Sequence, residues 1–254
     1  MNNIYFISDS HLAFQNAGAE KLKRQKLLDF FEYLLSAESG ASTLYILGDL
    51  FDFWFEWYHV IPKYWFEILY RLRQLVDAGV TVNLVTGNHD FYPGQYLENE
   101  IGMRCFHEQH QFEIDSRRFF VAHGDGYAKK DRGYRLLKRI IRHPLSIFLY
   151  KTLISPDLGI EMARWTSHSS RKLVKIQKES WANEYYQFAR QKFTEGFDYV
   201  ILGHIHYPMI REEENSGKVY VNCGDWVKYF TYAQYDGSQL VLKTYPFLPD
   251  PEKS

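Results

Sequence analysis

Five short apolar runs, each followed at once by aspartate, asparagine or histidine, restrict what this chain can fold into more than any other feature. They read FISDSH, LYILGDLFD, LVTGNHD, FFVAHGD and VILGHIH. Runs of this length, rich in Ile, Val, Phe and Tyr, are typical of β-strands. In α/β sheets, ligands gather beyond the carboxyl ends of the strands, where a rigid scaffold holds the loops. We therefore expect these strand ends to converge on one functional edge.

The rest of the chain fits a mixed α/β architecture. Residues 20–38 and 62–79 have apolar side chains at helical spacing, and the second segment opens on a proline suited to a first helical turn. Alternating strands and helices followed by a strand-rich end predict two packed sheets. The predicted strands are residues 3–8, 43–48, 80–86, 118–122, 199–202, 218–222, 230–235 and 239–245.

Residues 127–195 lack strand signal and are predicted to be helical. Between Lys129 and Lys178, 13 Lys and Arg residues stand against three acidic ones, a local charge of +10 in a chain whose net charge is −1. The cations alternate with Leu, Ile and Phe, as in helices that lie on anionic lipid, which makes a merely solvated basic face the weaker alternative. We expect one domain, residues 1–254, with a helical cap inserted at about 127–195.

Cysteine usage and hydropathy exclude several classes of protein. Cys105 and Cys223 are far apart and lack zinc-type spacing, so neither a disulfide framework nor a thiolate metal site is expected. The opening residues, MNNIYFISDSH, lack the basic and apolar regions of a signal peptide, and no run of about 18 apolar residues occurs. We expect a cytoplasmic protein that does not cross the membrane.

The polar side chains at the strand ends are of the kinds that bind metal ions. His204 and His206, like Asp9 and His11, are two positions apart, so on an extended segment both members of a pair face the same side. A glycine precedes three of the clusters, where the missing Cβ allows a close approach to an ion. Nitrogen and oxygen ligands without thiolate suit Mn²⁺, Fe²⁺ or Zn²⁺, and their number exceeds what one tetrahedral site uses. A two-metal centre is predicted from the candidate donors at these strand ends, which are Asp9, His11, Asp49, Asn88, His89, Asp90, His123, His204 and His206.

Any one of these clusters also has an ordinary explanation. An isolated histidine in a loop is more often solvated or hydrogen-bonded than bound to a metal. Five clusters in this order, each at a predicted strand end, favour the functional interpretation. The histidines without that context are expected to be ordinary surface or hydrogen-bonding residues: His59, His107, His110, His143 and His168.

Taken together, the motifs DxH at 9–11, GDxxD at 48–52, GNHD at 87–90, HGD at 123–125 and GHxH at 203–206 resemble those of the calcineurin-like metallophosphoesterases. The resemblance covers residues 1–126 and 197–245. It implies a four-layer α-β-β-α sandwich with a dinuclear centre at one edge, where two divalent ions bind, Mn²⁺ being expected before Fe²⁺ or Zn²⁺. It also implies that Asp49 bridges the ions, that one is held by Asp9, His11 and His206, and that the other is held by Asn88, His123 and His204.

Such a centre requires no protein nucleophile, because divalent cations activate water and neutralise charge on the phosphoryl group. His89, next to Asn88, is placed to protonate the leaving oxygen or to stabilise its charge, and Asp90 is expected to orient that imidazole. Asp52 is expected to support the ligands or cap a loop rather than to bind metal.

The stretch AHGDGYAKKDRGYRLLKRI and the helices after it resemble the cap of the UDP-2,3-diacylglucosamine pyrophosphatases of lipid A biosynthesis. That subgroup releases UMP and 2,3-diacylglucosamine 1-phosphate, and its substrate needs an apolar chamber beside cations. The resemblance implies a diacylated UDP-sugar as substrate and peripheral attachment to the anionic inner face of the cytoplasmic membrane. Proteobacterial members carry arginine where this chain has His89. By similarity the sugar and diphosphate would contact Asp131, Tyr134, Arg164, Ser167 and Arg171.

Two alternatives use the same core. A phosphodiesterase of nucleotides or nucleic acid would track phosphates with the basic insertion, but aliphatic side chains outnumber the stacking aromatics that single strands favour, so no nucleic-acid partner is expected. A non-catalytic scaffold would be expected to have lost ligands, whereas the set here is complete. The aromatic stretch at residues 51–66 has two equally weighted interpretations, packing on the core or walling an acyl chamber or dimer contact.

Overall fold

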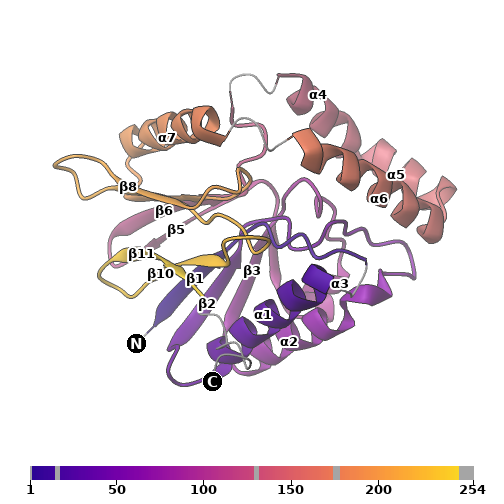
Figure 1. Ribbon diagram of the computed structural model, residues 1–254, viewed down its shortest axis with the longest axis horizontal. Coiled ribbons are helices and arrows are strands. Elements are labelled where there is room, and N and C mark those ends of the chain that lie inside the picture. The colour runs from indigo at the N-terminus through magenta and orange to yellow at the C-terminus, as the bar shows by residue number, and fades with distance from the viewer. Residues whose placement is uncertain (1, 15–17, 129–131, 174–177, 246–254) are drawn as a thin grey trace.

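The computed structural model describes residues 2–14, 18–128, 132–173 and 178–245, and this part of the chain contains two sheets flanked by helices (Figure 1). The strand orders are β11-β10-β1-β2-β3-β4 and β5-β6-β7-β9-β8. The strands are β1 Asn3–Ile7, β2 Ala41–Ile46, β3 Thr81–Val85, β4 Arg104–Phe106, β5 Gln109–Ile114, β6 Arg117–Ala122, β7 Tyr199–Leu202, β8 Met209–Glu212, β9 Val219–Asn222, β10 Thr231–Tyr235 and β11 Leu240–Thr244. The helices are α1 Gly18–Leu35, the 3₁₀ turn Lys63–Trp65, α2 Phe66–Asp77, α3 Tyr96–Asn99, α4 Arg132–Ile141, α5 Pro144–Leu153, α6 Pro156–Leu173 and α7 Lys178–Thr194.

Side-chain alternation along the strands builds three apolar layers. In β1, Tyr5 and Ile7 pack toward α1 and α2, whereas Ile4 and Phe6 pack between the two sheets. This follows from the two-residue period of a strand, which sends successive side chains to opposite faces. A third layer lies between the second sheet and α7. The order of layers is therefore α1 and α2, first sheet, second sheet, α7, and the predicted four-layer sandwich is confirmed.

Parallel pairing brings the carboxyl ends of the central strands to a common edge. In the first sheet β1, β2 and β3 run parallel, and in the second sheet β6, β7 and β9 do so. The five polar clusters follow β1, β2, β3, β6 and β7. Another parallel strand, β9, ends at the same edge with Asn222 and is followed by Cys223, Gly224 and Asp225.

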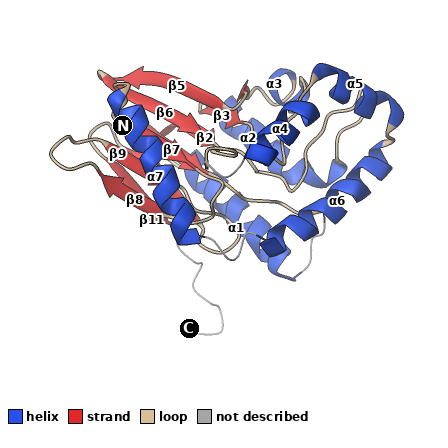
Figure 2. Ribbon diagram, turned by 90° about the horizontal axis from the view of Figure 1, so that it is seen from above, coloured by secondary structure: helices blue, strands red, loops and turns tan. Residues whose placement is uncertain are grey.

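The helices after residue 126 lie in two separate places in the structure. Helix α7 buries Ala182, Tyr185 and Ala189 against Phe120 and Val200 of the second sheet, so it is an outer layer of the sandwich. Helices α4, α5 and α6 instead lie together beyond the edge of the sheets (Figures 1 and 2). We call these three helices the cap; the predicted boundaries of 127–195 thus also included a helix of the core. Among the described helices, none is both long and apolar enough to span a bilayer.

The eight predicted strands are confirmed to within two residues at each end. The strands that were not predicted, β4, β5 and β8, all lie at sheet edges. In β5 exposed and half-buried residues alternate, and its sequence QHQFEI contains two apolar residues, so it has no apolar run to detect. An edge strand exposes more of its surface than a central strand, and its sequence signal is correspondingly weaker.

The aromatic side chains of residues 51–66 pack in two different clusters. Phe51, Trp54 and Trp65 belong to the layer between the first sheet and its helices. A separate cluster packs against Ile147 and Tyr150 of α5 and is formed by Phe53, Phe55 and Trp57. The interpretation of packing on the core therefore holds for the first set, and the second set fixes the cap to the core, while an acyl chamber or dimer contact stays a prediction.

Candidate active site

One group of donor atoms combines loops from the two sheets. Asp9 and His11 follow β1, and His206 follows β7; one donor atom from each lies within 4.8 Å of the others. The Oδ1 atom of Asp9 is 3.6 Å from Nε2 of His11 and 3.4 Å from Nε2 of His206. Two imidazoles thus converge on one carboxylate oxygen.

A second group lies beside the first. Asp49, His123 and His204, from the loops after β2, β6 and β7, also place donor atoms within 4.8 Å of one another. The Oδ1 atom of Asn88 is 3.1 Å from Nε2 of His123, and Nδ1 of His204 is 3.1 Å from the same nitrogen. The predicted second set of ligands is thus gathered in one place.

Asp49 lies between the two groups. Its Oδ2 atom is 3.5 Å from Nε2 of His11 and 3.3 Å from Nε2 of His123. Its Oδ1 atom accepts the main-chain N–H of His89 at 2.9 Å. The structure therefore brings all seven predicted ligands together, with the predicted bridging carboxylate in the middle.

The backbone at these residues adopts a conformation that side chains other than glycine rarely take. Left-handed φ angles cost about 1 kcal/mol or more for each such residue and cluster at functional sites. Main-chain contacts between the loops hold the conformation, such as the N–H of His11 donating to the Asp49 carbonyl at 2.9 Å. The positive φ values are 56° at Asp9, 41° at His11, 53° at Asp49, 70° at His204 and 52° at His206.

Two glycines allow the loops to approach this closely. A Cβ atom on Gly87 would overlap the Asp49 carboxylate and lie 2.7 Å from its main-chain nitrogen. A Cβ atom on Gly203 would overlap the Ser8 hydroxyl and lie 2.7 Å from Oδ2 of Asp9. Each glycine therefore makes room for a carboxylate of the site.

Opposite charges compensate one another in this buried cluster. Although burial favours their neutral forms, the pKa values of Asp9 and Asp49 are lowered, by His206 and by His123 respectively. Burial also opposes the charged form of His11, yet the nearby carboxylates of Asp52 and Asp9 raise its pKa to about 10. Burial and the neighbouring His123 lower the pKa of His204 to about 4. A cation bound among these donors would replace protons, so metal binding must release them.

The donors fit a metal centre by a further criterion. Oδ1 of Asp9 and both ring nitrogens of His11 are buried without a well-aligned hydrogen bond to any described residue. Buried polar atoms are otherwise nearly always hydrogen-bonded, because leaving one unpaired is costly. Nitrogen and oxygen donors without thiolate match Mn²⁺, Fe²⁺ or Zn²⁺. The cluster therefore has the composition and the unsatisfied atoms of a site for divalent ions.

A second tier of oxygen atoms lies behind the imidazoles. Nδ1 of His11 is 3.3 Å from Oδ1 of Asp52, in agreement with a supporting role for this aspartate. Nδ1 of His123 is 2.8 Å from the Leu47 carbonyl, and Nδ1 of His206 is 3.2 Å from Oδ2 of Asp225. Asp225 was missed at the sequence level, because a single acid after a short strand is not a recognisable motif.

The imidazole of His89 lies beside the donor cluster, and its neighbours differ from those predicted. Its Nδ1 atom is 2.7 Å from the Asp52 carbonyl, so the main chain of Asp52, rather than the predicted Asp90, orients the ring. Asp90 instead accepts the N–H groups of Gly87 and Leu50 at 2.7 and 2.9 Å, and thereby joins the loops after β2 and β3. Burial lowers the pKa of His89.

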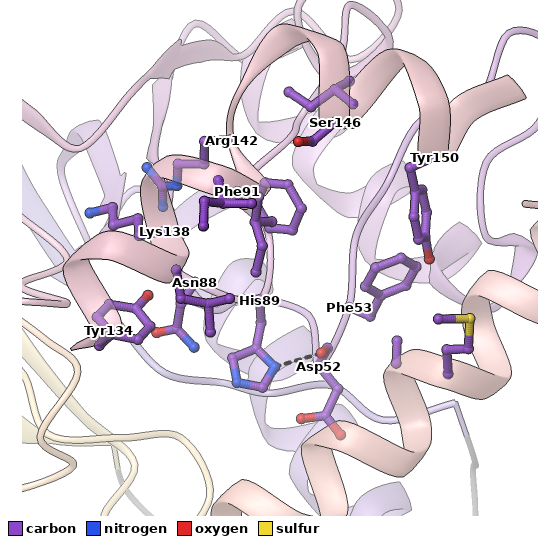
Figure 3. A pocket seen from close by; sticks show the side chains of 16 residues that line it. Asp52, Phe53, Asn88, His89, Phe91, Tyr134, Lys138, Arg142, Ser146 and Tyr150 are labelled. Carbon is purple, nitrogen blue, oxygen red and sulfur yellow. Dashed lines mark hydrogen bonds between the residues drawn. The ribbon is translucent and has the colours of Figure 1, made fainter. Parts of the chain in front are cut away.

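A cavity of about 540 Å³ opens beside this cluster (Figure 3). Asn88, His89 and Asp52 form its polar end, and Figure 3 shows Phe53 and Tyr150 on the opposite side. The cap supplies most of the remaining apolar wall: Leu137, Ile140, Ile141, Ile147, Met162 and Ala163. A polar site and an apolar chamber are thus continuous.

The residues predicted to contact the sugar and diphosphate have different placements. Tyr134 lines the cavity and donates its hydroxyl to Oδ2 of Asp125 at 2.8 Å. Arg164 is on the exposed side of α6 and pairs with Glu161 at 2.6 Å. Asp131 and the side chains of Ser167 and Arg171 lie outside the described residues, so their roles stay predictions.

Two cations that were not predicted, Lys138 in α4 and Arg142 just after that helix, stand where the polar site meets the chamber. Lys138 and Arg142 both line the cavity. Lys138 Nζ is 2.9 Å from Oδ2 of Asp125, and Arg142 donates to the Gly87 carbonyl at 2.7 Å. They were hidden among the 13 cations of the insertion, and only the fold shows that these two face the site.

Comparison with known proteins identifies the class. Residues 3–208 match the family model described as calcineurin-like phosphoesterase, which is more than half of the chain. The chain belongs to this family, as its motifs predicted, and it is a metal-dependent hydrolase of phosphoester or diphosphate bonds.

Particular relatives are similar over nearly their whole length. The chain is 29% identical to the UDP-2,3-diacylglucosamine hydrolase of Porphyromonas gingivalis, covering 96% of this chain and 97% of the relative. It is 28% identical to the protein of that name from Ectopseudomonas mendocina, covering 92% and 94%. Among solved structures, Vps29 of Entamoeba histolytica with zinc matches at 15% identity and a TM-score of 0.43, covering 94% of this chain and 89% of Vps29.

We expect Asp49→Ala to lose both metal occupancy and turnover, because this carboxylate contacts both groups of donors. Metal content after dialysis against Mn²⁺ and hydrolysis of bis-p-nitrophenyl phosphate measure the two effects. Asp157→Ala, which removes an exposed acid from α6, is the matched control and should change neither. Full occupancy and activity in Asp49→Ala would contradict a shared centre.

We expect Gly87→Ala to lower metal affinity and to destabilise the fold by about 1–3 kcal/mol, the usual cost of forcing extra atoms into a packed site. Gly133→Ala is the control, since a Cβ there meets nothing within 4 Å. That change should be neutral or stabilise α4 by up to about 1 kcal/mol. Thermal unfolding and metal titration would show the difference, and equal behaviour of the two variants would refute the close-approach argument.

Proposed function

We propose that the chain hydrolyses UDP-2,3-diacylglucosamine to UMP and 2,3-diacylglucosamine 1-phosphate. The observation that carries this proposal is the apolar cavity of about 540 Å³ that opens directly beside the buried cluster of aspartates and histidines. A substrate with a diphosphate and two acyl chains needs both environments next to each other. The relatives that carry the name of this hydrolase and align over nearly the full chain support the same assignment.

The ligand assignment is part of this proposal. Bound in the cluster, two divalent ions would activate water for attack on the α-phosphorus and neutralise phosphoryl charge. Mn²⁺ is the first expectation, with Fe²⁺ and Zn²⁺ as alternatives. Asp49 would be shared, with Asp9, His11 and His206 on one side and Asn88, His123 and His204 on the other.

His89 would act on the leaving group. Because the Asp52 carbonyl can only accept, Nδ1 of His89 carries a proton and the plane of the ring is fixed. Its Nε2 atom would then meet the leaving oxygen and stabilise the developing charge or transfer a proton. The position of His89 at the polar end of the cavity supports this role.

The cap would provide specificity. Lys138 and Arg142 would lie along the diphosphate, since phosphate oxygens seek such donors, and the apolar wall would hold acyl chains. Apart from the residues that line the cavity, the cap exposes large apolar residues such as Phe148, Leu153 and Trp165, which are 54%, 70% and 74% exposed. Together with the basic charge of this region, they support peripheral binding to the cytoplasmic face of an anionic membrane.

The proposal is tested by comparing three substrates after chelation and addition of Mn²⁺: UDP-2,3-diacylglucosamine, bis-p-nitrophenyl phosphate and a short DNA. We expect the lipid nucleotide to be preferred and UMP to be released. In water enriched in ¹⁸O, the label should appear in UMP, which reports attack at the α-phosphorus. Preference for DNA would instead favour a nucleic-acid phosphodiesterase.

We expect His89→Ala to lower turnover by roughly 10² while metals are retained, the usual scale for a group that assists proton transfer. Bis-p-nitrophenyl phosphate hydrolysis and metal content are measured together. His59→Ala removes an exposed histidine and serves as the control. Loss of metal from His89→Ala would show that His89 is a ligand, for which its closeness to His11 and Asp52 is suitable.

We expect Ala163→Phe to fill the chamber and lower kcat/KM for the lipid nucleotide by roughly tenfold or more, about 1.4 kcal/mol of transition-state stabilisation. The small diester should be little affected, because it draws no binding energy from the chamber. Leu158→Phe enlarges an exposed residue of the same helix and controls for added bulk. An equal loss with both substrates in the folded variant would count against an acyl chamber.

A further inference from the structure

Asp225 stands at the sixth strand end of the site edge, after β9, and is 3% exposed. Its two carboxylate oxygens have separate partners. Oδ1 accepts the N–H groups of Val227, Lys228 and Tyr229 at 3.0, 2.6 and 3.0 Å. Oδ2 lies 3.2 Å from Nδ1 of His206. One oxygen therefore holds a turn, and the other contacts an imidazole.

The segment that carries Asp225 is tied to both loops of the first donor group. The Asn222 amide donates to the Gly203 carbonyl at 2.7 Å, which anchors it to the loop of His206. The N–H of Trp226 donates to the Asp9 carbonyl at 3.1 Å. The position of the Asp225 carboxylate is thus fixed relative to Asp9 and His206 by the main chain on either side of it.

We propose that Asp225 is a positioning residue for the metal centre. It holds the ring of His206 so that Nε2 faces Asp9 and can bind the ion of the first group. A carboxylate can only accept, so it requires the proton of the imidazole on Nδ1. The lone pair is then on Nε2, which is 3.4 Å from Oδ1 of Asp9. This inference rests on the proposed assignment of His206 as a ligand.

The same arrangement recurs at two other histidines of the site. Nδ1 of His11 faces Oδ1 of Asp52 at 3.3 Å, and Nδ1 of His123 faces the Leu47 carbonyl at 2.8 Å. In each case an oxygen atom lies beside Nδ1, and Nε2 on the other side of the ring faces a carboxylate of the site. His206 needs such support more than His11 or His123, because its side chain is 22% exposed while theirs are 6% and 0% exposed.

The test separates the turn from the imidazole contact. In Asp225→Asn the carbonyl oxygen still accepts the three N–H groups, but the amide nitrogen now faces Nδ1 as a donor. That favours the proton on Nε2, the atom that must bind metal. Titration of the metal-free protein with Mn²⁺, followed by electron paramagnetic resonance, should show one of two sites weakened about 10- to 100-fold, the usual effect of removing such a partner.

Asp236→Asn is the matched control. Oδ1 of Asp236 accepts the N–H groups of Ser238 and Gln239, both at 2.9 Å, in a similar turn between β10 and β11. The Asp236→Asn variant should leave both Mn²⁺ affinities unchanged.

Turnover of bis-p-nitrophenyl phosphate by Asp225→Asn should approach the parent value at high Mn²⁺, since the residue acts through metal affinity and not on the substrate.

The outcomes distinguish this inference from the ligand assignment. If His206→Ala loses a metal but Asp225→Asn binds both with unchanged affinity, the positioning role is refuted. If His206→Ala keeps both metals, the ligand assignment itself fails. Should Asp225→Asn not fold, Asp225→Glu and Asp225→Gln compare an acceptor and a donor of equal length, and weaker Mn²⁺ binding by the glutamine variant is the expected result. Equal binding by those two variants would overturn the proposal.

Discussion

The contact of the Asp49 carboxylate with His11 and His123 is the interaction on which the arrangement of this site depends. His11 follows a strand of the first sheet and His123 a strand of the second, and one oxygen of Asp49 is 3.5 and 3.3 Å from their rings. The two sheets must therefore pack so that their carboxyl edges meet, and the apolar layer between them sets that distance. Gly87 lacks a side chain because Asp49 occupies its place.

The central strands and the donor residues could be predicted, because both depend on side-chain type and on position at the end of an apolar run. Hydrophobic runs located the central strands, and the residues just after them were the donors that the fold brings together. Edge strands such as β5 were not predicted, because half of their residues face solvent and no apolar run forms. Helix α7 was grouped with the cap because its composition is helical, whereas only packing shows that it covers the second sheet.

Other features of the site have no sequence signature. The left-handed backbone at Asp9 and His204 is unexpected for residues other than glycine and arises from main-chain contacts between loops. The orienting partner of His89 is a carbonyl, which any residue at position 52 would supply, so the nearby Asp90 was the more visible candidate. Asp225 is distant in sequence from His206 and becomes meaningful only when β9 is placed beside β7.

The cap also explains why one stretch of sequence is both basic and apolar. Its inner side must meet two environments within one cavity, the buried charges near Asn88 and the aromatic wall around Phe53. Lys138 and Arg142 lie at the first of these and are held there by Asp125 and the Gly87 carbonyl, so the cap is attached to the loop that carries Asn88. At its far end, Tyr150 packs against Phe55 with ring centroids 4.8 Å apart. Because polar contacts fix one end and aromatic contacts the other, a ligand that spans the cavity would bridge both attachments. Under the proposed function, the cap would recognise the head and tail of such a ligand while the chemistry stays in the loops of the sandwich.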